Sequence, residues 1–216
     1  MDSLITTCVA RQENDEFYLL HVNYRQRTEK KELEAFHKLC EYFKPKEYKI
    51  INIDYLKDFG GSSLIDENAP IPLYDELTPN SQLPTSYVPY RNGNLISIAT
   101  SYAEVIRANK IYIGAIEVDG SGYPDCRRVY YDALESAINL GTKDDTNISL
   151  ITPLINLKKS EIIKLGISLN APFELSWSCY QNNDLACGVC DSCYLRLKAF
   201  KEVGIDDPIP YINKKL

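Results

Sequence analysis

The sequence predicts an α/β fold, a Rossmann-like parallel sheet flanked by helices, with a C-terminal zinc-binding segment. Short apolar runs alternate with segments of helical periodicity along most of the chain, which is the pattern of repeated β–α–β units. Strands in such units lie parallel, because each crossover helix returns the chain to the same end of the sheet. Four cysteines then crowd into residues 179–193. We therefore expect an α/β domain over residues 1–170 and a zinc-binding segment with a C-terminal helix over residues 171–216.

The composition narrows the class of protein. A chain of 216 residues with 44% hydrophobic and 25% charged residues can bury a sizeable core. It has no apolar run near the roughly 18 residues that cross a bilayer and does not open on a signal peptide. Seven cysteines, an odd number, suit a reducing compartment, so we expect a cytoplasmic protein with no membrane partner. The net charge of -6 and the lack of a basic stripe argue against a nucleic-acid partner and favour a small-molecule substrate.

The first elements alternate between helix and strand. We expect a helix over residues 4–10, a strand over 16–22, a helix over 28–43 and a strand over 46–54. Asp2 or Ser3 is the expected N-cap of the first helix, and Pro45 should end the second. Ligands bind beyond the carboxyl ends of parallel strands, so the loops after these two strands are candidate binding loops.

The second half continues the alternation after a long loop. Residues 58–87 hold four prolines and no periodicity, which is typical of a lid, a substrate loop or a partly disordered segment. We then expect a helix from residue 88 onward, a strand over 110–116, a helix after residue 127, a strand over 147–152, and helices over 156–166 and 192–203. Gly166 and Gly204 should end the last two. In the helix after residue 88, the expected buried face holds Leu95, Ile98, Ala99, Tyr102 and Val105.

The four clustered cysteines have the spacing C-x7-C-x2-C-x2-C. Tetrahedral zinc takes four thiolates at about 2.3 Å, and close C-x2-C pairs present two sulfurs on one tight turn. Gly188 lies where such a turn needs a permissive backbone. Disulfides and buried reduced thiols are the alternatives, but the spacing favours structural Zn²⁺. The expected ligands are Cys179, Cys187, Cys190 and Cys193. Since protein would fill all four positions, the chemistry must come from elsewhere.

Several separate motifs carry a resemblance to a known family. They are residues 24–27, Gly60-Gly61-Ser62, residues 87–92, Ser121-Gly122-Tyr123-Pro124-Asp125-Cys126-Arg127, Thr152-Pro153-Leu154, residues 160–162, and Trp177-Ser178-Cys179 with the cysteine cluster. In this order and over nearly the whole chain, they resemble the QueC family of PP-loop ATP pyrophosphatase enzymes. The resemblance implies an adenine nucleotide alpha hydrolase-like fold, with residues 1–170 as the PP-loop nucleotide-binding domain.

The phosphate loop departs from the family pattern. The family has S-G-G-x-D-S after its first strand, and of this loop the chain holds only Asp2 and Ser3, with Met1 at the variable position. Glycines in such a loop let bare backbone N–H groups approach a pyrophosphate beside a helix N-terminus. We expect Met1 to be an internal methionine, preceded in the native protein by roughly ten more residues, about one strand and a turn.

The resemblance implies a reaction. QueC enzymes convert 7-carboxy-7-deazaguanine and ammonia to 7-cyano-7-deazaguanine (preQ0), a queuosine precursor, and use ATP twice. ATP with Mg²⁺ is therefore expected, and a homodimer is a further expectation. Two alternatives stay open: another PP-loop ligase that acts on tRNA, against which the acidic balance argues, and a zinc-stabilised binding protein without catalysis.

The same resemblance implies roles for residues near the phosphate loop. Asp2 becomes the candidate magnesium or phosphate-loop acid and Ser3 a phosphate hydrogen-bond donor, and both are the candidate catalytic residues. The alternative is that they only cap a helix. Arg91 and Asn92 are candidates to bind the nucleotide or orient the substrate. The alternative there is a surface arginine beside a capping asparagine.

The turn after the third strand is the candidate substrate site. An arginine can pair with the substrate carboxylate, a carboxylate can accept paired N–H bonds from a guanine-like edge, and a tyrosine can stack on the ring. Tyr123, Asp125 and Arg127 are the residues expected to do so. A solvated turn is the alternative, because such residues are common in ordinary turns.

Overall fold

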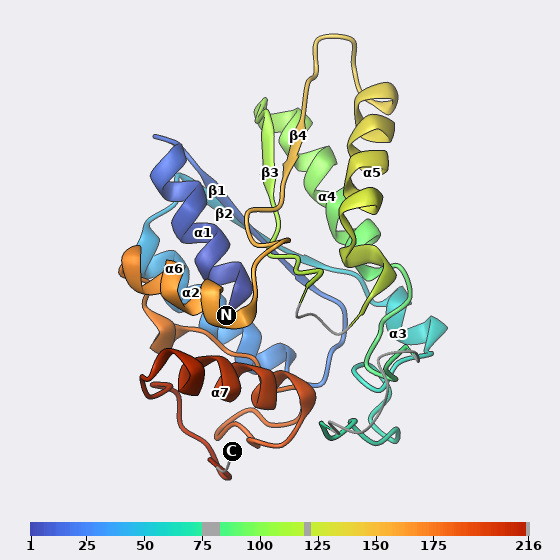
Figure 1. Cartoon of the computed structure of the whole chain (residues 1–216). Helices are drawn as coiled ribbons and strands as arrows, with labels where there is room; N and C mark the ends of the chain where they lie inside the picture. Colours follow the sequence, from blue (N-terminus) through green and yellow to red (C-terminus); the bar gives the residue numbers. More distant parts are fainter. Residues whose placement is uncertain (75–82, 119–121, 215–216) are drawn as a thin grey trace.

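The computed structural model describes residues 1–74, 83–118 and 122–214. Parallel strands and flanking helices confirm the α/β class (Figure 1). The helices are α1 (Asp2–Glu13), α2 (Glu29–Phe43), α3 (Tyr55–Phe59), α4 (Arg91–Ile106), α5 (Arg128–Gly141), α6 (Lys159–Ser168) and α7 (Asp191–Val203), with short 3₁₀ turns η1 (Pro124–Cys126) and η2 (Phe173–Leu175). The strands are β1 (Tyr18–Asn23), β2 (Glu47–Asn52), β3 (Lys110–Tyr112) and β4 (Ser149–Ile151).

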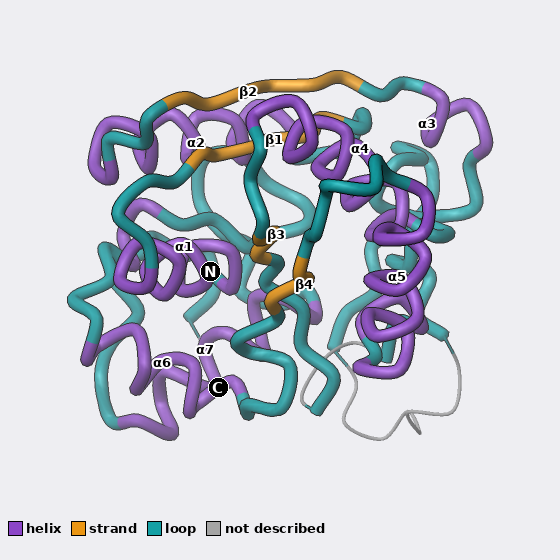
Figure 2. The backbone as a smooth tube through the Cα atoms, turned by 90° about the horizontal axis from the view of Figure 1, so that it is seen from above, coloured by secondary structure: helices purple, strands orange, loops and turns teal. Residues whose placement is uncertain are grey.

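The described strands form two pairs instead of one sheet. β1 pairs in parallel with β2, from Tyr18 opposite Glu47 to Asn23 opposite Asn52. β3 pairs in parallel with β4, and α5 connects them as α2 connects β1 with β2. Figure 2 shows the two pairs from above as separate groups of strands. The prediction of parallel strands is therefore confirmed. The prediction of one continuous sheet is not, because the strands of the described chain form two separate pairs.

The largest apolar core binds the N-terminal and C-terminal parts of the chain together. One face of α1 contributes Leu4 and Ile5, α6 contributes Ile162 and Ile163, and α7 contributes Phe200, all buried. A second core lies between α4, α5 and β4. Because α7 packs into the first core, the segment after residue 170 rests directly on α1 and α6. The predicted division into two regions at residue 170 remains a prediction.

Three local predictions were wrong. The helix at the N-terminus begins at Asp2 with Met1 as its N-cap, so neither Asp2 nor Ser3 caps it. Gly166 does not end α6, which continues to Ser168. A side chain at Gly166 would meet Phe173 and Ile5, so close packing explains this glycine. In α4, Ile96 and Ala103 are the buried apolar residues, whereas the predicted Val105 is 79% exposed, because the core lies on the adjacent stripe of the helix.

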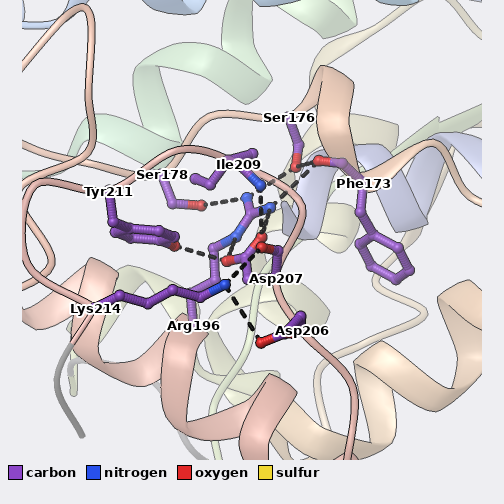
Figure 3. Close-up of polar contacts among 9 residues, drawn as sticks. All are labelled: Phe173, Ser176, Ser178, Arg196, Asp206, Asp207, Ile209, Tyr211 and Lys214. Carbon is purple, nitrogen blue, oxygen red and sulfur yellow. Dashed lines mark hydrogen bonds and ion pairs between the residues drawn. The ribbon is translucent and has the colours of Figure 1, made fainter.

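A buried ion pair fixes the C-terminal segment (Figure 3). Arg196 on α7 donates from Nε and Nη2 to both oxygens of Asp207, at 2.6 and 2.8 Å. Its Nη1 donates to the hydroxyls of Ser176 at 2.8 Å and Ser178 at 3.3 Å, and Nη2 also donates to the carbonyl of Phe173. Every nitrogen of the guanidinium therefore has an acceptor, which offsets the cost of burying the charge.

Candidate functional site

A cavity of about 750 Å³ lies between β1 and β3, with α1 on one side and α4 on the other. Its walls along the strands are largely apolar. Its far end, where the strands finish and α1 and α4 begin, is polar. Asp2, Ser3, Arg91, Asn92 and Tyr123 all line the cavity, so the structure brings five of the seven residues predicted to act on nucleotide or substrate to one hollow.

The start of α1 forms one wall of the polar end. Gly114, just after β3, allows this approach, because a side chain there would meet the backbone of Asp2 at 2.8 Å. The carboxylate of Asp2 accepts a hydrogen bond from the ammonium of Lys159 at 2.7 Å, and its second oxygen has no partner among the described residues. Burial acts to raise the pKa of Asp2, but the ammonium of Lys159 and the nearby Met1 amino group outweigh it and hold the pKa below its usual value.

Arg91 begins α4 and forms the opposite wall. Its Nη1 donates to the hydroxyl of Tyr24 at 3.2 Å, and the guanidinium carbon lies 5.7 Å from the centre of the same ring. Its Nε is buried without a hydrogen-bond partner in the described chain. Arg91 therefore carries a positive charge, faces the cavity and is matched by a phenol instead of a carboxylate. Such a group is suited to receive an anion.

Asn92 and Asp125 hold two loops together behind Arg91. The backbone N–H of Asn92 donates to the carboxylate of Asp125 at 2.9 Å, and the Asn92 side chain donates to the Asp125 carbonyl at 3.0 Å. Asp125 is only 3% exposed, and its other oxygen has no partner among the residues described. Asp125 thus accepts from one of the free backbone N–H groups at the start of α4, that of Asn92, and lies behind the cavity wall.

The structure places the other two predicted substrate residues, Tyr123 and Arg127, in different surroundings. Tyr123 is buried, lines the cavity and shares a hydrogen bond of 2.9 Å with the hydroxyl of Ser86. Arg127 is exposed at the residue before α5 and does not line the cavity. Ser121, the first residue of this motif, lies outside the described residues. The roles assigned to Tyr123, Asp125 and Arg127 stay predictions.

Lys159 is a residue of this site that sequence reasoning missed. It lies at the first position of α6 and lines the cavity 157 residues from its partner Asp2. A cation at a helix N-terminus is unfavourable with respect to the helix dipole. A lysine in that position therefore indicates a role other than stabilising the helix. Tyr24 and Tyr180 also line the cavity and were missed, although both lie inside motifs of the resemblance, residues 24–27 and the cysteine cluster.

The four clustered cysteines form a second, separate site. Their sulfur atoms lie within 4.8 Å of one another and all four residues are buried, so they could hold a metal ion. Backbone N–H groups of Gln181, Asn182 and Cys187 point to the sulfur of Cys179 at 3.3–3.4 Å, which stabilises a thiolate. Gly188 has a φ of +79°, and a side chain there would overlap the carbonyl of Asn213. Donor set and backbone therefore fit a closed four-thiolate metal site.

The described helices contain none that is long and apolar enough to cross a membrane.

Comparisons with known proteins agree with the geometry. The family model described as "Queuosine biosynthesis protein QueC" matches residues 1–204. A protein of Chlorobium phaeobacteroides named 7-cyano-7-deazaguanine synthase is 54% identical over 211 residues, which are 98% of this chain and 92% of that protein. Proteins of the same name from Chlorobium chlorochromatii and Chloroherpeton thalassium are each 51% identical over the same shares of the chains.

Proposed function

The chain belongs to the QueC family of queuosine biosynthesis proteins, and from that premise we propose that it makes 7-cyano-7-deazaguanine from 7-carboxy-7-deazaguanine, ammonia and ATP. This is the product in the name of the three relatives. The structural observation that carries the proposal is the meeting of Asp2, Lys159 and Arg91 at the polar end of the cavity. That end lies beyond the carboxyl ends of parallel strands, where nucleotides bind in α/β proteins.

The reaction needs activation because a carboxylate is a poor electrophile. Transfer of AMP to the carboxylate oxygen releases pyrophosphate and creates a good leaving group. Ammonia then displaces AMP to give the amide. A second adenylation, of the amide oxygen, allows that oxygen to leave with AMP as the nitrile forms. No protein nucleophile is required, so the residues contribute by positioning the reactants and neutralising charge.

The proposed roles follow the geometry of the polar end. Arg91 pairs with an anionic group of the nucleotide or with the substrate carboxylate, and Asn92 fixes the loop from which Arg91 starts. Ser3, in the first turn of α1, donates to phosphate beside the helix N-terminus. Asp2 is the group proposed to hold Mg²⁺, which when bound with ATP neutralises phosphate charge. Tyr123, which lines the cavity, is proposed to bind the deazaguanine. Asp125 and Arg127 do not line the cavity, so the same role proposed for them rests on the family resemblance alone.

The activity is tested by incubating the protein with 7-carboxy-7-deazaguanine, ammonium, ATP and Mg²⁺ and following the product by mass spectrometry. We expect the mass of the nitrile, with two ATP converted to AMP and pyrophosphate for each molecule formed. Leaving out ammonium should stop nitrile formation. Conversion of a tRNA substrate, with no turnover of the free deazapurine acid, would contradict the proposal.

We propose that the four-cysteine site holds one structural Zn²⁺ per chain. Zinc would join the turn at Cys179 to the start of α7, where Cys190 and Cys193 lie. Elemental analysis of purified protein checks this, and the expected content is about one zinc per chain.

Assembly and location are also proposals. Exposed apolar side chains on α4 and α5, such as Val105 and Leu140, support a homodimer. The seven cysteines support the cytoplasm. Light scattering after size exclusion gives the mass that decides between monomer and dimer.

A further inference from the structure

Three tyrosine side chains lie around Arg91 on the wall of the cavity. Tyr24 directly follows β1, Tyr123 directly precedes η1, and Tyr180 follows the first residue of the four-cysteine cluster. All three line the cavity together with Arg91, and each phenol lies close enough to interact with its guanidinium. The fold thus brings three separate segments to one cation, and we call Arg91 with these three tyrosines the Arg91 cage.

Hydrogen bonds connect the members of the Arg91 cage. The hydroxyl of Tyr24 accepts from Nη1 of Arg91 at 3.2 Å, and the guanidinium carbon lies 5.7 Å from the centre of the same ring. The hydroxyl of Tyr180 shares a hydrogen bond with that of Tyr123, which shares another of 2.9 Å with the hydroxyl of Ser86. A phenol that accepts one hydrogen bond still has its own proton to donate. The cage can therefore offer O–H groups to a ligand beside the N–H groups of the guanidinium.

The Arg91 cage carries one positive charge and no negative one. Phenols are neutral at physiological pH because their usual pKa is about 10, and burial raises the pKa of Tyr24 further. None of the ion pairs in the described chain includes Arg91. Its Nε is buried without a hydrogen-bond partner among the described residues. A cation removed from water in this way is stabilised by a single bound anion.

The opposite wall of the cavity has a different pattern of charge. There the carboxylate of Asp2 and the ammonium of Lys159 lie 2.7 Å apart beside the N-terminus of α1. A polyphosphate carries several negative charges and suits that wall, where Mg²⁺ and a helix N-terminus would share them. In the cage, one guanidinium among phenols would leave most of those charges unpaired. The rings of Tyr24 and Tyr123 also offer apolar faces on which a flat heterocycle can pack.

We propose that the Arg91 cage binds the carboxylate of 7-carboxy-7-deazaguanine and that Tyr24 and Tyr180 determine the preference for this acid over the neutral amide. The inference rests on the proposed function for the identity of the ligand, and it decides between the two anions considered there for Arg91. The guanidinium donates to the carboxylate oxygens in the paired manner typical of arginine, and the two phenols add O–H donors. An amide in the same place has no charge and offers only one oxygen, because its NH₂ group cannot accept from Arg91.

The test measures binding by isothermal titration calorimetry in the absence of ATP. The ligands are 7-carboxy-7-deazaguanine and the corresponding 7-amide, and the proteins are the parent chain, Tyr24→Phe and Tyr180→Phe. We expect the parent to bind the acid about tenfold or more tightly than the amide, because a hydrogen bond to a charged group is stronger than one to a neutral group. Each variant should lose about tenfold in affinity for the acid and little for the amide. Equal binding of acid and amide by the parent, no binding of the acid, or an equal loss for both ligands in the variants would overturn the proposal.

Two further titrations distinguish the cage from its surroundings. Tyr102→Phe is the matched control, since Tyr102 also lines the cavity but its hydroxyl donates to Glu47 at 2.8 Å, and it should keep the preference for the acid. Inorganic pyrophosphate is the probe for the phosphate site, and its affinity should be the same in Tyr24→Phe and Tyr180→Phe as in the parent. A loss of pyrophosphate affinity as large as the loss for the acid would assign the cage to the nucleotide and contradict the proposal. Retained affinity for the amide shows that the variants are folded.

The binding readout succeeds or fails separately from turnover. If the chain prefers the acid and both tyrosine variants lose that preference, but no nitrile forms in the activity assay, then the proposed function fails and the assignment of the cage stands. If nitrile forms and the variants keep the preference of the parent, the assignment of the cage fails alone.

Discussion

Arg91 is the side chain on which binding should depend most. A guanidinium keeps its charge at physiological pH, and here it is paired with a phenol while its buried Nε lacks a partner in the described chain. We predict that Arg91→Met lowers kcat/KM for nitrile formation by about 10²–10³-fold, or roughly 3–4 kcal/mol of transition-state binding. Steady-state kinetics with each substrate varied in turn measures the loss.

Arg91→Lys separates charge from shape. Lysine keeps the charge but loses the planar fork, so this variant should recover only part of the activity. Both variants should melt close to the parent protein, because Arg91 makes no ion pair with a described residue. A loss of activity that only follows a loss of folded protein would count against a binding role.

Lys159 offers a second prediction at the same end of the cavity. Its ammonium lies 2.7 Å from Asp2 and lines the space proposed for phosphate. Lys159→Met should raise KM for ATP about tenfold or more, because a charge-assisted contact contributes roughly 1.5–3 kcal/mol. Lys164→Met is the control, since Lys164 is exposed on the same helix. If both variants raised KM for ATP equally, the effect would come from the overall charge of α6, and a specific contact between Lys159 and ATP would be contradicted.

The start of α7 should depend on the proposed zinc. Cys193 is buried in the first turn of α7, with its sulfur among those of the other three cysteines. We predict that Cys193→Ser reduces bound zinc from about one per chain to a small fraction and lowers the melting temperature, because three ligands do not close a tetrahedral site. Cys40→Ala, on α2 and outside the cluster, should keep its zinc. Metal analysis and calorimetry on the same samples give both values.

The other end of the same segment depends on an ion pair. Arg196 and Asp207 are 1% and 4% exposed, so removing one partner leaves a buried charge alone. Arg196→Met should therefore cost about 3–5 kcal/mol in the free energy of unfolding. Arg196→Met combined with Asp207→Asn should cost less than the single change. Urea denaturation of the two single variants and the double variant gives the coupling energy, and simple additivity would contradict the pairing.

Elements with strong local signals were predicted well from the sequence. α2 and α7 show clear periodicity, and Gly204 ends α7 in the left-handed conformation as expected. The strand predicted over residues 110–116 pairs only at Lys110–Tyr112, because the length of a strand depends on its partner and β4 is as short. Gly166 was wrongly predicted to end α6. A glycine is needed there because Phe173 packs against it, and no local sequence pattern reveals that contact.

Across the whole molecule, the class of fold and the four-cysteine cluster were visible in the sequence, whereas the spatial grouping was not. Asp2 and Lys159 belong to the ends of different helices that only the tertiary fold brings together. Arg127 and Tyr123 share one short motif, yet the fold turns one to solvent and the other to the cavity. The sequence shows which functional groups such a motif contains. The direction in which each side chain points depends on tertiary packing, which the sequence pattern does not show.

The buried amino group of Met1 predicts how overall stability changes with pH. The unfolded chain holds this proton up to about pH 8, and the folded chain only up to about pH 5. Between these values the unfolded state binds more protons, so the free energy of unfolding should rise with pH, by on the order of 4 kcal/mol from this group. Urea denaturation from pH 5 to 8 measures the slope. N-terminal acetylation should remove this part of it, and an equal slope in acetylated protein would contradict the assignment.

The hydroxyl of Ser178 connects the ion pair of Arg196 to the four-cysteine cluster. Ser178 precedes the first residue of the four-cysteine cluster and accepts a hydrogen bond from Arg196, whose helix carries Phe200 into the core with Leu4 of α1. If the proposed zinc holds Cys179, its loss would loosen the neighbouring Ser178 and, through Arg196, the packing of α7 against Leu4 of α1. The proposed zinc would thereby help to hold α1, which bears Asp2, although its four cysteines do not line the cavity.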